Sequence, residues 1–253
     1  MSTGVEKIRI SCVSYLNSKP FLFGLQHHSI HEEIEVSLDH PRDCAEKLIQ
    51  GKVEIGLVPV ASIPLLKNHT IITNKCIAAD GDVLSVMLFS ECPIDDIETI
   101  LLDYQSLTSV NLCKLLCRDF WNIHPDFIQT EPGYENEIKG TTAAVVIGDR
   151  ALQLLGKHKF AYDLPGAWKK MTGLPFVFAC WVTNSKLPEG FESRFDEALE
   201  AGLDAIEQLI PSLAHSHGIQ PSVITDYFKK HLKFRMTERH REAMKLYLGK
   251  III

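Results

Sequence analysis

Residues 8–21 read IRISCVSYLNSKPF, a strand pattern that runs into a polar turn. Apolar and polar side chains alternate over residues 8–12, which is typical of a strand with one buried face. The polar residues within 13–21 then predict a turn where the strand ends. The segment therefore predicts a strand whose carboxyl end carries polar side chains.

Further strand and helix patterns follow this segment. Residues 41–49 predict a short helix, with Pro41 suited to its first turn and Gly51 placed after its end. Residues 53–60 predict the next strand, and residues 71–78 and 83–89 are further strand candidates.

A second group of elements begins near residue 95. Residues 99–103 predict a strand, and SLTS at residues 106–109 predicts the cap of a helix. The apolar run AAVVI at residues 143–147 predicts a strand covered on both faces, and it ends at GDR. In the C-terminal third, the pattern predicts helices at about residues 191–210, 221–231 and 237–247.

The alternation of strands and helices predicts an α/β fold with a mostly parallel sheet. Such sheets bind ligands at the carboxyl ends of their strands. Three polar turns fall at such ends, at residues 14–17, 106–109 and 148–149. We therefore expect them to converge on one small-molecule site, although the pattern alone indicates no reaction.

The composition excludes some classes of partner. The chain has 253 residues, of which 45% are apolar and 23% charged, and its net charge is −6. Because phosphate backbones are bound by basic patches, an acidic chain without a Lys/Arg cluster is not expected to bind nucleic acid. A small anionic ligand is compatible with this charge if helix N-termini bind it.

The sequence also predicts the cellular location of the protein and the state of its cysteines. The N-terminal residues lack the basic and apolar segments of a signal peptide, and no apolar run approaches the roughly 20 residues of a membrane span. We therefore expect a cytoplasmic protein with no membrane partner, and a homodimer stays open. The seven scattered cysteines are expected to be buried thiols.

The sequence predicts no metal site. Cys113 and Cys117 share a helix face, but no His pair accompanies them. His215 and His217 lack further ligands at metal spacing.

Six blocks of the chain resemble signatures of the chorismate dehydratase family of the futalosine route to menaquinone. They keep the family's order over about 170 residues: SYLNSKPF (14–21), GLVPV (56–60), VLSVMLFS (83–90), DYQSLTS (103–109), IGD (147–149) and a block over 168–181 that contains TGLPFVFA. One block alone would be unspecific, whereas the ordered set is a strong signal. Two positions depart from the family pattern: Leu107 stands where an Arg is usual, and Asp82 where a Pro is common.

The resemblance implies a two-lobed fold of the periplasmic-binding-protein-like type II class. It would have mixed, mostly parallel sheets, helices on both faces and a cleft between the lobes. Lobe one would comprise residues 1–88 and 178–253, and lobe two residues 89–177. Two hinge strands, near residues 85–90 and 176–181, would connect them.

The implied reaction removes water from the dianion chorismate and leaves 3-[(1-carboxyvinyl)oxy]benzoate, without a cofactor. The proton that is lost lies on the carbon bearing the enolpyruvyl ether and is vinylogous to the ring carboxylate. Asn17 is the candidate catalytic residue, because its amide would donate to the leaving hydroxyl or to the charge that builds on the carboxylate. A simple turn formed by the Asn17 side chain is the alternative.

The candidate substrate-binding residues are Ser14, Tyr15, Ser85, Ser106, Thr108, Ser109, Gly148, Asp149 and Trp181. The hydroxyls at residues 106–109 and the free N–H groups of a helix start would bind a carboxylate, or the hydroxyls would only cap the helix. As an alternative to binding substrate, the Ser85 hydroxyl would bond to the backbone of a hinge. The alternative role for Asp149 is to cap the next helix. Tyr15 and Trp181 would wall the cleft or belong to the core.

No His or carboxylate pair falls inside these turns. We therefore expect the enolpyruvyl carboxylate of the substrate to take the proton while the protein orients it. Two other functions stay open. A small-anion binding protein of this fold that serves a transporter would need an export signal. A 1,4-dihydroxy-6-naphthoate synthase of the same pathway would have a different opening turn and a catalytic His.

Overall fold

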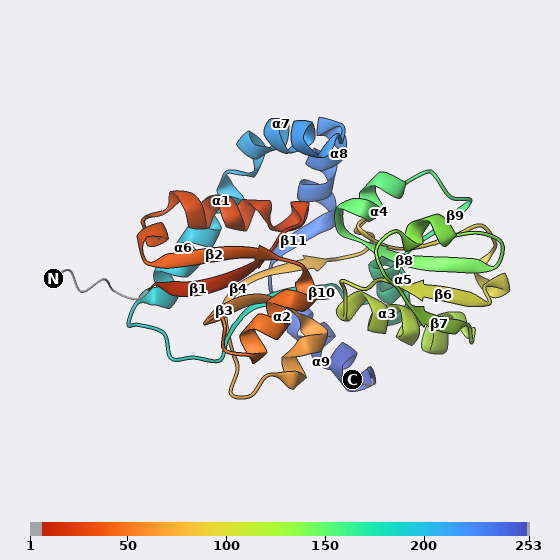
Figure 1. The fold of residues 1–253 in the computed structure, drawn as a ribbon, viewed down its shortest axis with the longest axis horizontal. Coiled ribbons are helices and arrows are strands. Elements are labelled where there is room, and N and C mark those ends of the chain that lie inside the picture. Colours follow the sequence, from red (N-terminus) through yellow and green to blue (C-terminus); the bar gives the residue numbers. More distant parts are fainter. Residues whose placement is uncertain (1–6, 252–253) are drawn as a thin grey trace.

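The computed structural model describes residues 7–251 and contains two β-sheets side by side (Figure 1). The first sheet has the strand order β11-β4-β10-β3-β1-β2, and the second has the order β7-β6-β8-β5-β9. Residues 1–6, which bear on the expected lack of an export signal, and residues 252–253 lie outside the described part.

The strands of the first sheet come from both ends of the described chain: β1 (Ile8–Val13), β2 (Ile34–Asp39), β3 (Ile55–Pro59), β4 (Thr70–Ala79), β10 (Phe176–Thr183) and β11 (Leu232–Arg235). The strands of the second sheet come from one continuous segment: β5 (Val86–Ser90), β6 (Thr99–Leu102), β7 (Asp126–Gln129), β8 (Thr142–Ile147) and β9 (Phe160–Asp163). The second sheet is therefore inserted into the chain that forms the first.

Helices cover both faces of the first sheet. In the view of Figure 1, α1 and α7 lie above this sheet, and α2 and α9 lie below it. Helix α6 packs along α1, where glycines on both helices allow close approach. The bounds are α1 (Lys19–His27), α2 (Pro41–Ile49), α6 (Phe191–Asp204), α7 (Ile206–His217), α8 (Pro221–Asp226) and α9 (Glu238–Lys250).

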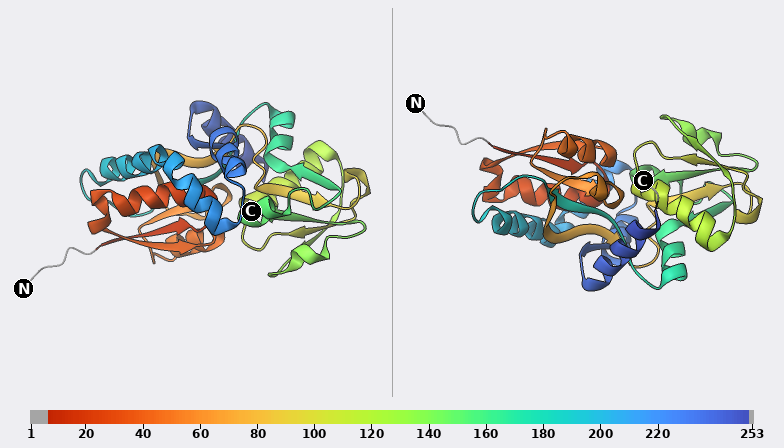
Figure 2. Two further views of the ribbon diagram at one scale, coloured as in Figure 1. Left: turned by 90° about the horizontal axis from the view of Figure 1, so that it is seen from above. Right: turned by 90° about the horizontal axis from the view of Figure 1, so that it is seen from below.

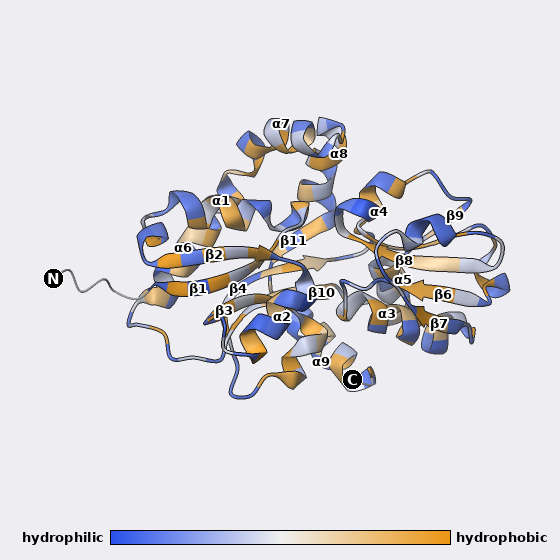
Figure 3. Ribbon diagram, viewed as in Figure 1, coloured by the Kyte–Doolittle hydropathy of each residue, from blue (hydrophilic) through white to orange (hydrophobic). Residues whose placement is uncertain are grey.

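The second sheet lies between two hydrophobic clusters. Helices α3 (Thr108–Leu116) and α5 (Leu164–Thr172) cover the face that joins the main core. On the other face, Met87 and Phe89 of β5 pack with Tyr134 and with Ala151 of α4 (Gly148–Leu154). The strands are therefore mainly hydrophobic, whereas the outward faces of the helices carry hydrophilic residues (Figure 3).

Short helical turns complete the structure. They are η1 (Leu16–Ser18), η2 (Ser29–Glu32), η3 (Val60–Leu65), η4 (Ile94–Asp96), η5 (Cys117–Trp121), η6 (Tyr134–Glu137) and η7 (Tyr227–His231). The helix predicted over 191–210 is divided into α6 and α7 at Ala205. The helix predicted over 221–231 ends at Asp226 and continues as the wider turn η7.

The strand directions correct one expectation. The mixed α/β architecture is present, but within residues 7–251 four neighbouring pairings are parallel and five are antiparallel, so the sheets are not mostly parallel. Strands β5 and β10 account for four of the five. The chain enters a new sheet at each of them, and each runs antiparallel to both of its neighbours.

The chain crosses between the sheets twice, at residues 80–85 and at residues 173–175. Two further views show the two halves side by side, joined by these crossings (Figure 2). We use "lobe one" for residues 7–79 and 176–251, and "lobe two" for residues 86–172. Strands β5 and β10, which contain the two expected hinge positions, each lie wholly within one sheet.

Two expectations on composition can be compared with the structure. All seven cysteines lie within residues 7–251 and are free; six are buried as expected, whereas Cys92 is only half-buried and departs from the expectation. In the same range, no helix combines the length and the apolar character that crossing a bilayer requires.

Candidate functional site

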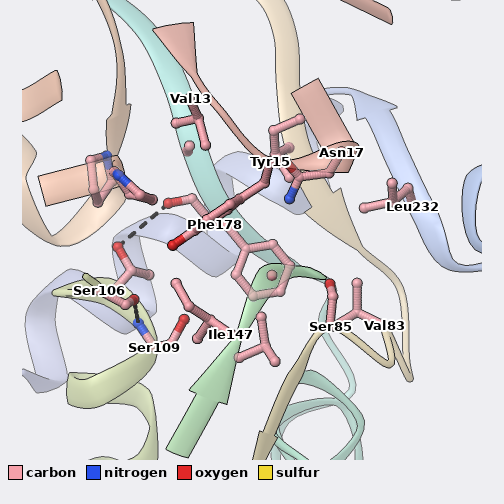
Figure 4. Close-up of a pocket in the computed structure, with 17 residues that line it drawn as sticks. Val13, Tyr15, Asn17, Val83, Ser85, Ser106, Ser109, Ile147, Phe178 and Leu232 are labelled. Atoms are coloured by element: carbon pink, nitrogen blue, oxygen red, sulfur yellow. Dashed lines mark hydrogen bonds between the residues drawn. The ribbon is translucent and has the colours of Figure 1, made fainter. Parts of the chain in front are cut away.

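A cavity lies between the lobes and receives side chains from both (Figure 4). Measured by the positions open to the centre of a water molecule, its volume is about 50 Å³. One water needs roughly 10–15 Å³ on this measure. The lining residues are Val13, Tyr15, Asn17, Pro41, Pro59, Ile77, Val83, Ser85, Val86, Ser106, Thr108, Ser109, Ile147, Gly148, Phe178, Ala179 and Leu232.

The turn after β1 supplies Tyr15 and Asn17. It is held by the Ser18 hydroxyl, which donates to the carbonyl oxygen of Tyr15 at 2.8 Å. The amide nitrogen of Asn17 points into the cavity (Figure 4). Its carbonyl oxygen is buried and has no hydrogen-bond partner among residues 7–251. Because a buried acceptor without a partner costs about 1–3 kcal/mol, this amide is suited to a ligand that brings a donor.

Two helices begin at the cavity, α2 at Pro41 and α3 at Thr108. Neither N-cap residue supplies a side-chain cap. At α3 the Ser106 hydroxyl accepts a hydrogen bond from the N–H of Ser109 at 3.0 Å, so this serine caps the helix and lines the cavity at once. Free N–H groups at helix starts carry partial positive charge and favour anions.

The segment that crosses into lobe two places Ser85 opposite the start of α4. The N–H of Gly148 donates to the carbonyl oxygen of Ser85 at 2.8 Å. Gly148 has φ +64°, and a Cβ there would lie 3.0 Å from Cδ2 of Tyr15. Only glycine gives the Tyr15 ring this room and adopts this backbone conformation without strain.

The cavity wall carries no formal charge. Among the described residues that line it there is no Asp, Glu, His, Lys, Arg or Cys. The one phenol, Tyr15, donates to the side-chain oxygen of Gln105. Burial, followed by the charge of Asp103, raises the pKa of Tyr15, so this phenol stays protonated. The site therefore offers neutral donors and helix starts, and no side chain that would act as a base near pH 7.

Charged groups lie behind the wall. The Arg150 guanidinium donates to Asp103 at 2.7 Å and to the side-chain oxygen of Gln105 at 2.9 Å. It also pairs with Glu135. Burial raises the pKa of Asp103, whereas Arg150 opposes that rise. This cluster fixes Gln105, which in turn holds the Tyr15 hydroxyl.

Hydrogen bonds across the cavity hold the lobes together. The Tyr15 hydroxyl of lobe one bonds Gln105 of lobe two. The N–H of Leu16 donates to the Asp149 carboxylate at 2.9 Å, and the N–H of Ala61 donates to the Thr108 hydroxyl at 3.1 Å. These bonds fix the position of one lobe relative to the other at the cavity.

Seven of the ten sequence-predicted site residues line the cavity, namely Tyr15, Asn17, Ser85, Ser106, Thr108, Ser109 and Gly148. Three do not. Ser14 follows β1, and its N–H donates to the backbone carbonyl oxygen of Asp39 at 2.9 Å. Asp149 accepts from Leu16 and lies 3.6 Å from His217, so it joins the lobes. Trp181 is fully buried between Phe21 and Phe195 and belongs to the core.

Two residues that sequence analysis missed complete the site. Gln105 lies inside the DYQSLTS block but was not singled out, although its amide connects Tyr15 to Arg150. Tyr227 comes from the C-terminal third, and its hydroxyl donates to the Ser85 hydroxyl at 2.8 Å. Nothing in the local sequence of Tyr227 indicates this contact, which spans 142 residues.

Comparison with known proteins gives the family. The model of a menaquinone biosynthesis family matches residues 8–251. The chain belongs to this menaquinone biosynthesis family. Among curated proteins, the one named chorismate dehydratase from Thermus thermophilus is 27% identical to this chain over 250 residues, which cover 85% of this chain and 90% of that protein.

Solved structures confirm the fold. A protein from Archaeoglobus fulgidus superposes with a TM-score of 0.76 at 14% identity, covering 99% of this chain and 97% of that one. The alkanesulfonate-binding protein from Xanthomonas axonopodis pv. citri gives 0.63 at 12% identity, covering 96% and 93%. A Candida albicans protein described as having the generic periplasmic-binding-protein fold gives 0.64 at 11% identity, covering 96% and 90%. This family member therefore has the periplasmic-binding-protein-like fold.

Proposed function

We propose that this protein is a chorismate dehydratase, a cytoplasmic lyase that converts chorismate to 3-[(1-carboxyvinyl)oxy]benzoate and water in the futalosine route to menaquinone. The family and the name of the Thermus thermophilus relative support the pathway and the reaction. The observation that carries the proposal is the unpartnered side-chain oxygen of Asn17 in an interlobe cavity whose described lining has Tyr15 as its one ionisable side chain. Closure of the two lobes on the substrate is part of the proposal.

The cavity has the chemistry that a dianion with one reactive hydroxyl requires. The starts of α2 and α3 and the hydroxyls of Ser106 and Ser109 would bind the carboxylates. The hydroxyl of chorismate both donates and accepts, so it would satisfy the Asn17 oxygen and receive the Asn17 N–H. Fixed neutral donors in a closed site cost no reorganisation when charge moves to the leaving oxygen.

The proposed reaction needs one proton acceptor and one leaving group. The proton leaves the carbon that bears the enolpyruvyl ether, and the electron pair delocalises onto the ring carboxylate. The adjacent C–O bond then breaks, and hydroxide departs with the proton as water while the ring becomes aromatic. Because the described wall holds no ionisable side chain except the protonated Tyr15, the enolpyruvyl carboxylate of the substrate is the base in this proposal.

The same observation weighs against the naphthoate synthase of this pathway, for which a catalytic His is expected. No His lines the cavity within residues 7–251. His40 is near, with its Nε2 atom 3.4 Å from the Gln105 amide nitrogen and its ring centroid 6.2 Å from that of Tyr15, but it is not among the lining residues.

The test is direct conversion of chorismate by the purified protein, followed by mass spectrometry. We expect loss of chorismate, a stoichiometric gain of 3-[(1-carboxyvinyl)oxy]benzoate, and no requirement for added metal. Asn17→Ala should lower kcat by at least about 100-fold, the usual effect of removing one such donor. Chorismate that is bound and recovered unchanged would instead indicate a binding protein.

A matched control is Asn136→Ala. Asn136 is exposed in η6, and its amide donates only to the nearby carbonyl of Gly133 at 3.2 Å. This variant should retain wild-type turnover. A wild-type rate for Asn17→Ala would remove the role that we give to this amide.

A further inference from the structure

Ser85 is fixed from two sides at the crossing into lobe two. Its carbonyl oxygen accepts from the N–H of Gly148 at 2.8 Å. The Asp163 carboxylate accepts from the N–H groups of Val83 and Leu84 at 2.8 and 2.7 Å. Leu84 itself has φ +66°, so the backbone here adopts a costly conformation that these bonds maintain. Lobe two therefore holds the backbone of Ser85.

Lobe one holds the side chain of Ser85. The hydroxyl of Tyr227, in η7, donates to the Ser85 hydroxyl at 2.8 Å. Tyr227 is 1% exposed and is absent from the cavity lining, so a ligand in the cavity would not contact it. Burial raises the pKa of Tyr227, and the neighbouring Ser85 and Asn17 side chains oppose this rise only in part. The phenol therefore keeps its proton at physiological pH.

In the hydrogen bond between these two hydroxyls, one group donates its proton and the other accepts it. Tyr227 has one proton and gives it to the Ser85 oxygen. The proton of Ser85 must then point elsewhere, and the Ser85 hydroxyl donates to no other group among residues 7–251. Because the Ser85 side chain lines the cavity, the remaining direction leads into the cavity (Figure 4).

We propose that Tyr227 is a positioning residue that directs the proton of the Ser85 hydroxyl into the cavity, so that this hydroxyl donates to a substrate oxygen. This inference rests on the proposed function. It gives the C-terminal segment, which lies outside the signature blocks, a part in the site. The effect of Tyr227 passes through Ser85, so it depends on Ser85 being present.

The experiment is a double-mutant cycle with chorismate as substrate, measuring kcat and KM separately. Tyr227→Phe removes one oxygen from a fully buried ring and should lower kcat about tenfold with little change in KM, because the lost orientation acts in the transition state. Ser85→Ala should lower kcat by about 100-fold. The double variant should be no slower than Ser85→Ala, because residues that act through one contact are not additive.

The matched control is Tyr247→Phe. Tyr247 is also 1% exposed, and its hydroxyl donates to the carbonyl oxygen of Thr108 at 2.8 Å without touching Ser85. Its effect on kcat, whatever its size, should be the same with and without Ser85. Circular dichroism and thermal unfolding of each variant establish that the kinetic comparison is made on folded protein.

The outcomes are distinguishable. If the wild-type protein does not convert chorismate, the proposed function fails, and this inference fails with it. If the wild type is active but Tyr227→Phe keeps the full rate, or lowers kcat equally with and without Ser85, the inference alone is overturned. A lower rate that disappears in the Ser85→Ala background supports it.

Discussion

Replacing Gly24 with alanine should separate two helices of lobe one. Gly24 lies in α1, where an added Cβ would come within 1.9 Å of the carbonyl oxygen of Ala198 in α6. On the facing side, a Cβ on Gly202 would lie 2.0 Å from the carbonyl oxygen of Pro20. Since real Cβ atoms essentially never come closer than 3.0 Å, the helices must move apart by about 1 Å.

Two opposing terms decide the size of the effect. Alanine stabilises a helix interior by about 0.5–1 kcal/mol relative to glycine. Overpacking costs about 1–3 kcal/mol, and the upper end applies because the opposing atom is backbone and cannot rotate away. The net loss should be about 2 kcal/mol, which lowers the Tm of a chain of this size by roughly 4–8 °C. Because α1 follows Asn17 directly, kcat should fall as well.

Thermal unfolding of Gly24→Ala beside Gly249→Ala is the assay. Gly249 lies in α9, and no atom lies within 4 Å of the position its Cβ would take. The same substitution should therefore leave the Tm of this control unchanged or raise it slightly. If both variants have the Tm of the wild type, or if Gly24→Ala is the more stable, the close packing of α1 on α6 does not support the lobe as argued.

Two further predictions concern the cavity and the crossing segment. Gly148→Ala should lower both stability and turnover, because it adds backbone strain of roughly 1–2 kcal/mol and presses on the Tyr15 ring. Gly156→Ala has similar strain at φ +75° with open space around it, so it should lower stability only, and equal turnover in the two variants would contradict the Tyr15 contact. Burial raises the pKa of Asp163 from 3.8 to about 6, and Asp82 adds to the rise. Its contribution to stability is thus full below about pH 4 and is lost as the pH rises through about 6. The unfolding free energy of the wild type minus that of Asp163→Asn, measured in urea from pH 4 to pH 7.5, should therefore fall with pH, and a rise would refute the assignment.

Local patterns predict the elements around the site because local chemistry determines them. The alternation in residues 8–12 and the apolar run at 143–147 correspond to β1 and β8, and the polar turns that follow both strands meet at the cavity. The direction of the strands was harder to predict from the sequence. Strands β5 and β10 are apolar except for their last residues, Ser90 and Thr183, so nothing in their sequence shows that they run antiparallel to their neighbours.

Contacts between side chains that are distant in the chain could not be predicted from the sequence either. Trp181 stands in a signature block, yet its ring packs on Phe21 and Phe195 because β10 turns that face towards α1 and α6. Tyr227 shows the opposite case. It lies in an ordinary helical pattern, and it contacts Ser85 only because the C-terminal segment folds over the crossing at residues 80–85. Sequence patterns show which turns carry polar groups, whereas tertiary packing decides which side chains those groups meet.

The insertion of one sheet into the other sets the order in which the protein can be completed during translation. All five strands of lobe two, residues 86–163, leave the ribosome before β10, which must pair between β3 and β4. At about 5–20 residues per second, the approximately 100 residues from the end of β4 to the start of β10 take roughly 5–20 seconds to synthesise. During that interval β3 and β4 have unpaired edges of the kind that recruit other chains. The nascent chain therefore exposes these two strand edges until β10 has been synthesised.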